Sequence, residues 1–183
     1  MSIAVPGAAQ IDELLHTHIA EYPDFPNPGV LFRDITPLLR DADALRAVIR
    51  YWTTLIPEGV EYIVGTEARG FVLGAPLAYE IGAGFIPARK AGKLPGNPAG
   101  LTYDLEYGSA EIQLPENSLP AGARTVIVDD LLATGGTAAA TVELARRFDV
   151  EILGASFLIE LAGLGGREQL PGVPLSTVWT LDN

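Results

Sequence analysis

The chain contains no cysteine, which excludes disulfide bonds, thiolate nucleophiles and thiolate metal ligands together. Its only histidines, His16 and His18, lie in a stretch with helical apolar spacing, so we expect them at the surface and expect no metal cluster. No apolar run is long enough to span a membrane, and the amino terminus lacks the basic start and apolar core of a signal peptide. We therefore expect a cytoplasmic protein with no membrane partner.

Lysine is scarce, since Lys90 and Lys93 are the only two, and both stand close to Arg89. The net charge of −11 argues against binding to nucleic acid, whose phosphate backbone is held mainly by lysine and arginine. Cations gathered at one place in an acidic chain indicate a site for a small anion, although a solvated basic turn is the alternative.

A length of 183 residues with 48% hydrophobic residues suits one domain, residues 1–183, with a core of its own. Strand-like and helix-like segments alternate along the chain, which predicts an α/β fold with a mostly parallel central sheet and helices on both faces. We expect helices over 41–56, 71–81 and 137–147, strands over 61–65, 84–88, 126–128, 152–161 and 174–181, and a mobile loop over 91–102 leading into a hairpin within 103–114.

The segment 125–137 is the most informative part of the sequence, because a β-branched strand ends in Asp129 and Asp130 and a small-residue loop then opens a helix. Ligands bind at the carboxyl ends of strands in open α/β sheets. The backbone and hydroxyl groups of residues 134–137 suit a phosphate monoester, and the two carboxylates can accept hydrogen bonds from vicinal ribose hydroxyls. Neither a Walker A loop nor a dinucleotide fingerprint is present. The alternative is a buried strand whose acidic pair merely caps the next helix.

At this motif the chain resembles the phosphoribosyltransferases, which implies transfer of a phosphoribosyl group from phosphoribosyl pyrophosphate. Mg²⁺ would be carried mainly by that substrate, completed by water and possibly by the carboxylates of Asp129 or Asp130. The ribose and 5′-phosphate would be bound by Asp129, Asp130, Ala133, Thr134, Gly135, Gly136 and Thr137. The pyrophosphate would be bound by Glu67, Ala68, Arg69, Arg89, Lys90 and Lys93. Arg69 and the acidic pair are the candidate catalytic residues within these sets.

The proline-rich segment 22–37 is too rich in proline and glycine at its start for regular helix, which predicts a stiff, ordered loop. Phe32 could stack on a planar base while the backbone of Leu31 and Arg33 reads the edge of that base. Composition alone favours the alternative, a connector with Phe25 and Phe32 packed into the core.

Four segments, 22–37, 67–71, 89–96 and 103–108, resemble the adenine-specific phosphoribosyltransferases and occur in the family's order. The resemblance implies a base-covering hood over 22–37, in which the backbone of Leu31 and Arg33 holds adenine and Phe32 and Leu161 sandwich it. It also implies a lid over 89–108, in which Glu106 handles the purine ring proton, Tyr107 helps to position the substrates and Lys93 supplies a cation. A homodimer is implied as well.

From the residues alone, Glu106 is a carboxylate on a solvated strand face. A phosphoribosyltransferase for hypoxanthine, xanthine or orotate is one alternative, which the hood would distinguish. A non-catalytic sensor of purines or phosphoribosyl pyrophosphate is another, although the acidic chain lacks the basic module that binding to nucleic acid would need.

Overall fold

The computed structural model describes residues 5–104 and 108–182, which fall into two compact units. The first unit is Met1–Trp52 and the second is Thr53–Asn183. Among the described residues, no helix combines the length and the apolar character needed to cross a membrane.

The first unit holds three helices and a two-stranded antiparallel sheet: α1 (Ala8–His18), β1 (Ala20–Tyr22), β2 (Phe32–Asp34), α2 (Thr36–Arg40) and α3 (Ala42–Thr53). Its core is formed by apolar side chains from these helices and the segments between them, namely Ile11, Leu15, Ile19, Ile35, Leu38, Ala44, Val48, Ile49 and Trp52. The apolar stripe expected in the helix 41–56 is confirmed in part, because Val48, Ile49 and Trp52 are buried while the helix ends at Thr53. The segment 22–37 is not one loop, because Tyr22 of β1 pairs with Phe32 of β2 and the segment ends in α2.

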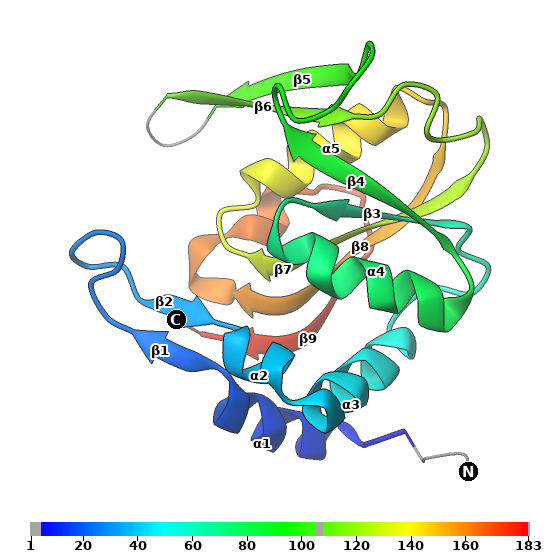
Figure 1. Ribbon diagram of the computed structural model, residues 1–183. Coiled ribbons are helices and arrows are strands. Elements are labelled where there is room, and N and C mark those ends of the chain that lie inside the picture. Colours follow the sequence, from blue (N-terminus) through cyan, green and yellow to red (C-terminus); the bar gives the residue numbers. More distant parts are fainter. Residues whose placement is uncertain (1–4, 105–107, 183) are drawn as a thin grey trace. The chain divides into compact units, whose positions relative to one another are not determined.

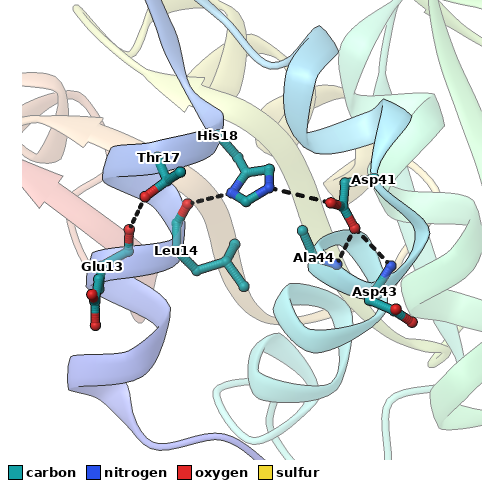
Figure 2. Close-up of polar contacts among 7 residues, drawn as sticks. All are labelled: Glu13, Leu14, Thr17, His18, Asp41, Asp43 and Ala44. Carbon is teal, nitrogen blue, oxygen red and sulfur yellow. Dashed lines mark hydrogen bonds and ion pairs between the residues drawn. The ribbon is translucent and has the colours of Figure 1, made fainter.

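His18 joins α1 to the start of α3 rather than lying free at the surface (Figure 2). Its Nδ1 lies 2.9 Å from the carbonyl oxygen of Leu14, and its Nε2 lies 3.4 Å from a carboxylate oxygen of Asp41. The other oxygen of Asp41 accepts hydrogen bonds of 3.0 Å from the backbone N–H groups of Asp43 and Ala44. Asp41 thus caps α3 and holds His18 with one carboxylate.

The second unit is built on a seven-stranded sheet in the order β5-β6-β4-β3-β7-β8-β9 (Figure 1). The strands are β3 (Tyr62–Thr66), β4 (Gly84–Lys90), β5 (Ala99–Asp104), β6 (Ser109–Leu114), β7 (Arg124–Leu132), β8 (Glu151–Leu161) and β9 (Leu175–Leu181). Strands β4, β3, β7, β8 and β9 pair in parallel, and the β5–β6 hairpin joins them antiparallel at β4.

Two helices connect the parallel strands in opposite directions along the sheet. Helix α4 (Arg69–Ile81) leads from β3 outward to β4, and α5 (Gly136–Arg146) leads from β7 outward to β8. Because such crossovers are right-handed, the two helices cover opposite faces of the sheet, as the sequence predicts. The order of the strands therefore reverses between β3 and β7, and ligands bind at the carboxyl ends of strands at such a point.

Several boundaries differ from those expected. Residues 99–102 were expected in a mobile loop, but they belong to β5, because they pair with β6 and Leu101 packs against the core. Strand β4 continues through Arg89 and Lys90, which pair with β6. Strand β7 continues past the acidic pair to Leu132, because β8 pairs with it along that length.

Candidate functional site

The acidic pair lies near the carboxyl end of β7. This end borders the switch point, the place between β3 and β7 where the strand order reverses. Asp130 is 6% exposed, and its carboxylate lies 2.9 Å from Nε of Arg69, the first residue of α4. One carboxylate oxygen of Asp129 accepts a hydrogen bond of 2.8 Å from the backbone N–H of Asp130. The structure thus brings Arg69, Asp129 and Asp130 together. The Arg69 guanidinium partly neutralises the negative charge of the acidic pair.

The pKa values of the two carboxylates are raised because the groups lie side by side and largely away from solvent, with Asp130 buried and Asp129 partly buried. Burial raises the pKa of Asp129 to about 8, the negative charge of Asp130 adds to the rise, and the nearby Thr66 hydroxyl opposes it. Burial also raises the pKa of Asp130, against the opposing effect of the Arg69 guanidinium. Both effects favour the protonated form of this pair in the free protein.

Gly70 and Thr66 lie close to the Asp129 carboxylate; the sequence indicates Gly70 only as part of the loop 67–70 beside the pyrophosphate, and it does not indicate Thr66. A Cβ atom on Gly70 would lie 2.9 Å from Oδ1 of Asp129 and 3.0 Å from Oγ1 of Thr66. Only glycine lets the first turn of α4 come so close to β7. Thr66 is fully buried at the end of β3, one residue beyond the predicted strand, so its position relative to Asp129 depends on strand pairing.

The small-residue loop follows β7 and opens α5, as the sequence indicates. Gly135 has a φ of 84°, and a Cβ there would lie 2.5 Å from the carbonyl oxygen of Gly166. Gly166 begins the short 3₁₀ helix η2 (Gly166–Gln169), which therefore packs directly against the loop. The predicted loop residues Ala133, Thr134, Gly135, Gly136 and Thr137 stand together at the amino end of α5, where free N–H groups suit a phosphate.

The predicted pyrophosphate residues form a second ion pair beside the first. Nε of Arg89 lies 3.0 Å from a carboxylate oxygen of Glu67, and its Nη1 donates to the carbonyl oxygen of Lys93 at 3.1 Å. The Arg89 guanidinium also lies 5.9 Å from the centre of the Phe71 ring. Ala68 precedes α4 in the same loop as Glu67, whereas the side chains of Lys90 and Lys93 are exposed.

The hood residues form a pocket of their own in the first unit. The rings of Phe25 and Phe32 meet edge to face at 5.1 Å, and they line a pocket of about 420 Å³ with Tyr22, Pro23 and Asp24. Phe25 is 54% exposed, so the alternative in which it packs into the core is wrong. Leu31 is exposed. The Arg33 side chain is buried, and its Nε lies 3.4 Å from a carboxylate oxygen of Glu21, so only the backbone of Arg33 stays the predicted recognition group.

The remaining predicted residues are Leu161, Glu106 and Tyr107. Leu161 ends β8 in the second unit, where it is partly buried. Glu106 and Tyr107 lie outside the described residues.

The sequence and the fold of this chain are similar to those of known enzymes. The phosphoribosyl transferase domain model matches residues 41–174. The adenine phosphoribosyltransferase of Acaryochloris marina is 52% identical over 158 residues, which are 86% of this chain and 93% of that protein. Two solved structures are also similar. The adenine phosphoribosyltransferase of Rhodothermus marinus is 44% identical, with a TM-score of 0.89 over 94% of this chain and 99% of that one. The Saccharomyces cerevisiae enzyme, solved with an imino-altritol bisphosphate and adenine, is 40% identical, with a TM-score of 0.87 over 93% of this chain and 99% of that one.

Proposed function

Because this chain belongs to the phosphoribosyltransferase family, and within it to the adenine phosphoribosyltransferases, we propose that it converts adenine and phosphoribosyl pyrophosphate into AMP and pyrophosphate. This reaction salvages free purine bases. The observation that carries the proposal is the buried acidic pair of β7 at the switch point, followed directly by the glycine loop that opens α5.

The reaction breaks the bond between ribose C1′ and pyrophosphate, forms the bond from C1′ to N9 of adenine, and releases the N9 proton. Positive charge develops on the sugar ring as the leaving group departs, so the ribose must be held in place and the pyrophosphate neutralised. Asp129 and Asp130 accept hydrogen bonds from the ribose hydroxyls, and residues 133–137 hold the 5′-phosphate at the start of α5. These contacts fix C1′ between its two reaction partners.

Two cations of the site, Arg69 and Arg89, are held by carboxylates before any substrate arrives. Arg89 binds the pyrophosphate together with Lys90 and Lys93. To do so, Arg89 gives up its ion pair with Glu67 and pairs with the phosphate oxygens. Arg69 neutralises Asp130, which lets the acidic pair lie next to an anionic ligand. The cluster thus receives a negatively charged substrate in a protein whose net charge is −11.

The site fits Mg²⁺ that is carried by the substrate. In the part of the chain that the structure describes, no group of three or more histidine, cysteine or acidic side chains could hold a metal ion by itself. Two adjacent carboxylates, Asp129 and Asp130, nonetheless supply the oxygen ligands that Mg²⁺ prefers beside phosphate oxygens and water. When bound, the ion would neutralise the departing pyrophosphate.

Base recognition belongs to the hood. The Phe32 ring supplies an apolar face, Phe25 supports that ring at its edge, and the backbone of Leu31 and Arg33 reads the edge of the base. The roles of Leu161 in stacking, of Glu106 in taking the N9 proton and of Tyr107 in positioning the substrates stay predictions from the family resemblance.

The cellular setting follows from the substrate and the family. Phosphoribosyl pyrophosphate is highly charged and does not cross a bilayer unaided, so we place the reaction in the cytoplasm, where that substrate would be made. The homodimer is likewise carried over from the family resemblance.

A base panel tests the function directly. The purified protein is supplied with phosphoribosyl pyrophosphate and Mg²⁺ and with adenine, hypoxanthine, guanine, xanthine or orotate in turn, and nucleotide formation is followed. We expect AMP from adenine, and at most slow reaction with the other bases. Product from another base but not from adenine would refute the base specificity, and no product from any base would refute the transferase activity.

A further inference from the structure

A tyrosine outside the predicted site residues is hydrogen-bonded to the loop of residues 133–137. This loop is called the phosphate loop below, after its proposed ligand. Tyr103 lies in β5, and its phenol oxygen lies 3.1 Å from Oγ1 of Thr137 in the first turn of α5. The contact joins residues 34 positions apart in the chain, and both belong to the second unit. The sequence gives no sign of this contact, because it depends on the packing of α5 against β5 (Figure 1).

The strand and the helix are linked a second time at their far ends. Arg147, which follows α5, donates from Nη1 to the carbonyl oxygen of Gly100 at 3.2 Å. Tyr103 also packs, partly buried, against the hydrophobic core of this unit. Its ring is therefore fixed on one side by packing, while its hydroxyl points to a residue of the phosphate loop.

When a phosphate is bound, the two hydroxyl groups can share only one arrangement of donor and acceptor. A threonine hydroxyl has one proton to donate and lone pairs with which to accept. If Thr137 donates its proton to a phosphate oxygen, its own oxygen must accept the proton of Tyr103. The Thr137 carbonyl is used separately, because it accepts from Oγ1 of Thr141 at 2.7 Å. Hydrogen bonds in such a chain strengthen one another.

We propose that Tyr103 is a positioning residue for the 5′-phosphate: its phenol donates to Thr137, which turns the Thr137 hydroxyl proton toward the phosphate. The proposal rests on the proposed role of residues 133–137 in binding that phosphate. It concerns every ligand with a 5′-phosphate, which includes phosphoribosyl pyrophosphate, AMP and ribose 5-phosphate. It does not concern adenine or free pyrophosphate, which lack that group.

The variant Tyr103→Phe tests the proposal because it keeps the ring and removes only the hydroxyl. We expect the KM for phosphoribosyl pyrophosphate and the calorimetric Kd for AMP and ribose 5-phosphate to rise roughly three- to tenfold. The kcat, the KM for adenine and the Kd for pyrophosphate should stay within about twofold, and thermal unfolding should be unchanged. Tyr79→Phe is the matched control, since Tyr79 is 85% exposed on α4 and the same atom is removed.

Thr137→Val and the double variant separate this proposal from the site assignment on which it rests. Thr137→Val alone should weaken the same three ligands, and adding Tyr103→Phe to it should have almost no further effect. If Thr137→Val leaves all three affinities intact, the assignment of the phosphate loop fails and this proposal fails with it. If Thr137→Val weakens binding while Tyr103→Phe has no effect, or has an equal effect with and without Thr137, the positioning role of Tyr103 is refuted. A loss that extends to adenine and to thermal stability would show a structural role instead.

Discussion

At the scale of single residues, the site depends on the protonation of Asp129. Its carboxylate is surrounded by Thr66, Gly70 and a second carboxylate, so the charged form is disfavoured until a cation or a donor arrives. Ribose hydroxyls and substrate-borne Mg²⁺ would supply these, and binding would then release a proton. The surroundings of Asp129 thus favour its neutral form in the free protein.

Replacing Asp129 with Asn tests this protonation through stability. The folded-state pKa of about 8 lies above the unfolded value of 3.8, so the folded protein binds the extra proton and the wild type loses stability as pH rises between these values. Asn mimics the neutral form, so Asp129→Asn should be more stable than wild type by about 2 kcal/mol or more near pH 8, and equal to it near pH 4. Urea unfolding at several pH values measures the difference.

The same variant should also lower the kcat/KM for phosphoribosyl pyrophosphate roughly ten- to a hundredfold, because an acceptor of the ribose is weakened.

Asp149→Asn is the control for this experiment. Asp149 is exposed and has a φ of 57°, a conformation that Asn also tolerates. This variant should follow the wild-type pH dependence. Parallel curves for wild type and Asp129→Asn would contradict the raised pKa of Asp129.

At the scale of elements, the phosphate loop is supported from outside by η2. The close approach of Gly135 to Gly166 places η2 against the loop, and Arg167 within η2 binds Glu160 of β8 through two hydrogen bonds of 2.5 and 2.6 Å. The Glu160 side chain is 4% exposed, so its carboxylate is paired mainly with Arg167 and not with water. A strand end, a 3₁₀ helix and the loop thus form one connected support.

Arg167→Met should destabilise the protein by leaving the Glu160 carboxylate buried without its partner. We expect a loss of about 2 kcal/mol, below the values for fully buried pairs because Arg167 is half exposed. The double variant Glu160→Gln with Arg167→Met should recover much of that loss, since no buried charge remains. Arg46→Ala is the matched control, because Arg46 and Asp43 form an exposed pair that contributes at most about 0.5 kcal/mol. Equal losses from the Arg167 and Arg46 variants in urea unfolding would contradict the supporting role of Glu160 and Arg167.

The junction between α1 and α3 has a pH dependence of the opposite sign. Hydrogen bonds from the backbone N–H groups of Ala44 and Asp43 lower the pKa of Asp41, and the contact with His18 acts in the same direction (Figure 2). A lowered acid pKa contributes stability above its unfolded value, and that stability is lost as pH falls through the folded value. Asp41→Ala should therefore unfold at a lower temperature than wild type at neutral pH, and the gap should close in acid below about pH 4.

Asp41→Asn separates the two contacts that Asp41 makes. Asn caps a helix as well as Asp does, but it carries no charge for His18. It should thus be more stable than Asp41→Ala at neutral pH, and its remaining deficit relative to wild type reports the contact with His18. If the Ala and Asn variants melt together at every pH, Asp41 does not act as the cap of α3.

At the scale of the whole molecule, the reversal of strand order between β3 and β7 decides where the site forms. Helices α4 and α5 both begin at this reversal, so Arg69 comes to the acidic pair while the phosphate loop stays beside it. The cations lie in an acidic protein with a net charge of −11, and two of them are already paired with carboxylates. Recognition of an anionic substrate is therefore local and does not come from the overall charge.

Much of this arrangement could be predicted from local patterns. The strand that carries Asp129 and Asp130, the loop after it and the helix from Gly136 each follow from residue types over a few positions, although the strand runs on to Leu132. The expectations were wrong where distant pairing decides the outcome. Residues 99–102 form a strand only because β6 lies beside them, and Tyr22 pairs with Phe32 because the chain between them returns on itself.

The sequence by itself therefore determined the alternating α/β pattern, the acidic pair, the glycine loop and the family, because these are set by neighbouring residues and their order. The tertiary structure alone decided that Arg69 pairs with Asp130, that burial raises the pKa of Asp129, and that Tyr103 reaches Thr137. These contacts join residues tens of positions apart. They exist only when strand order, helix packing and the small volume of Gly70 bring the groups together, and no local pattern encodes such distances.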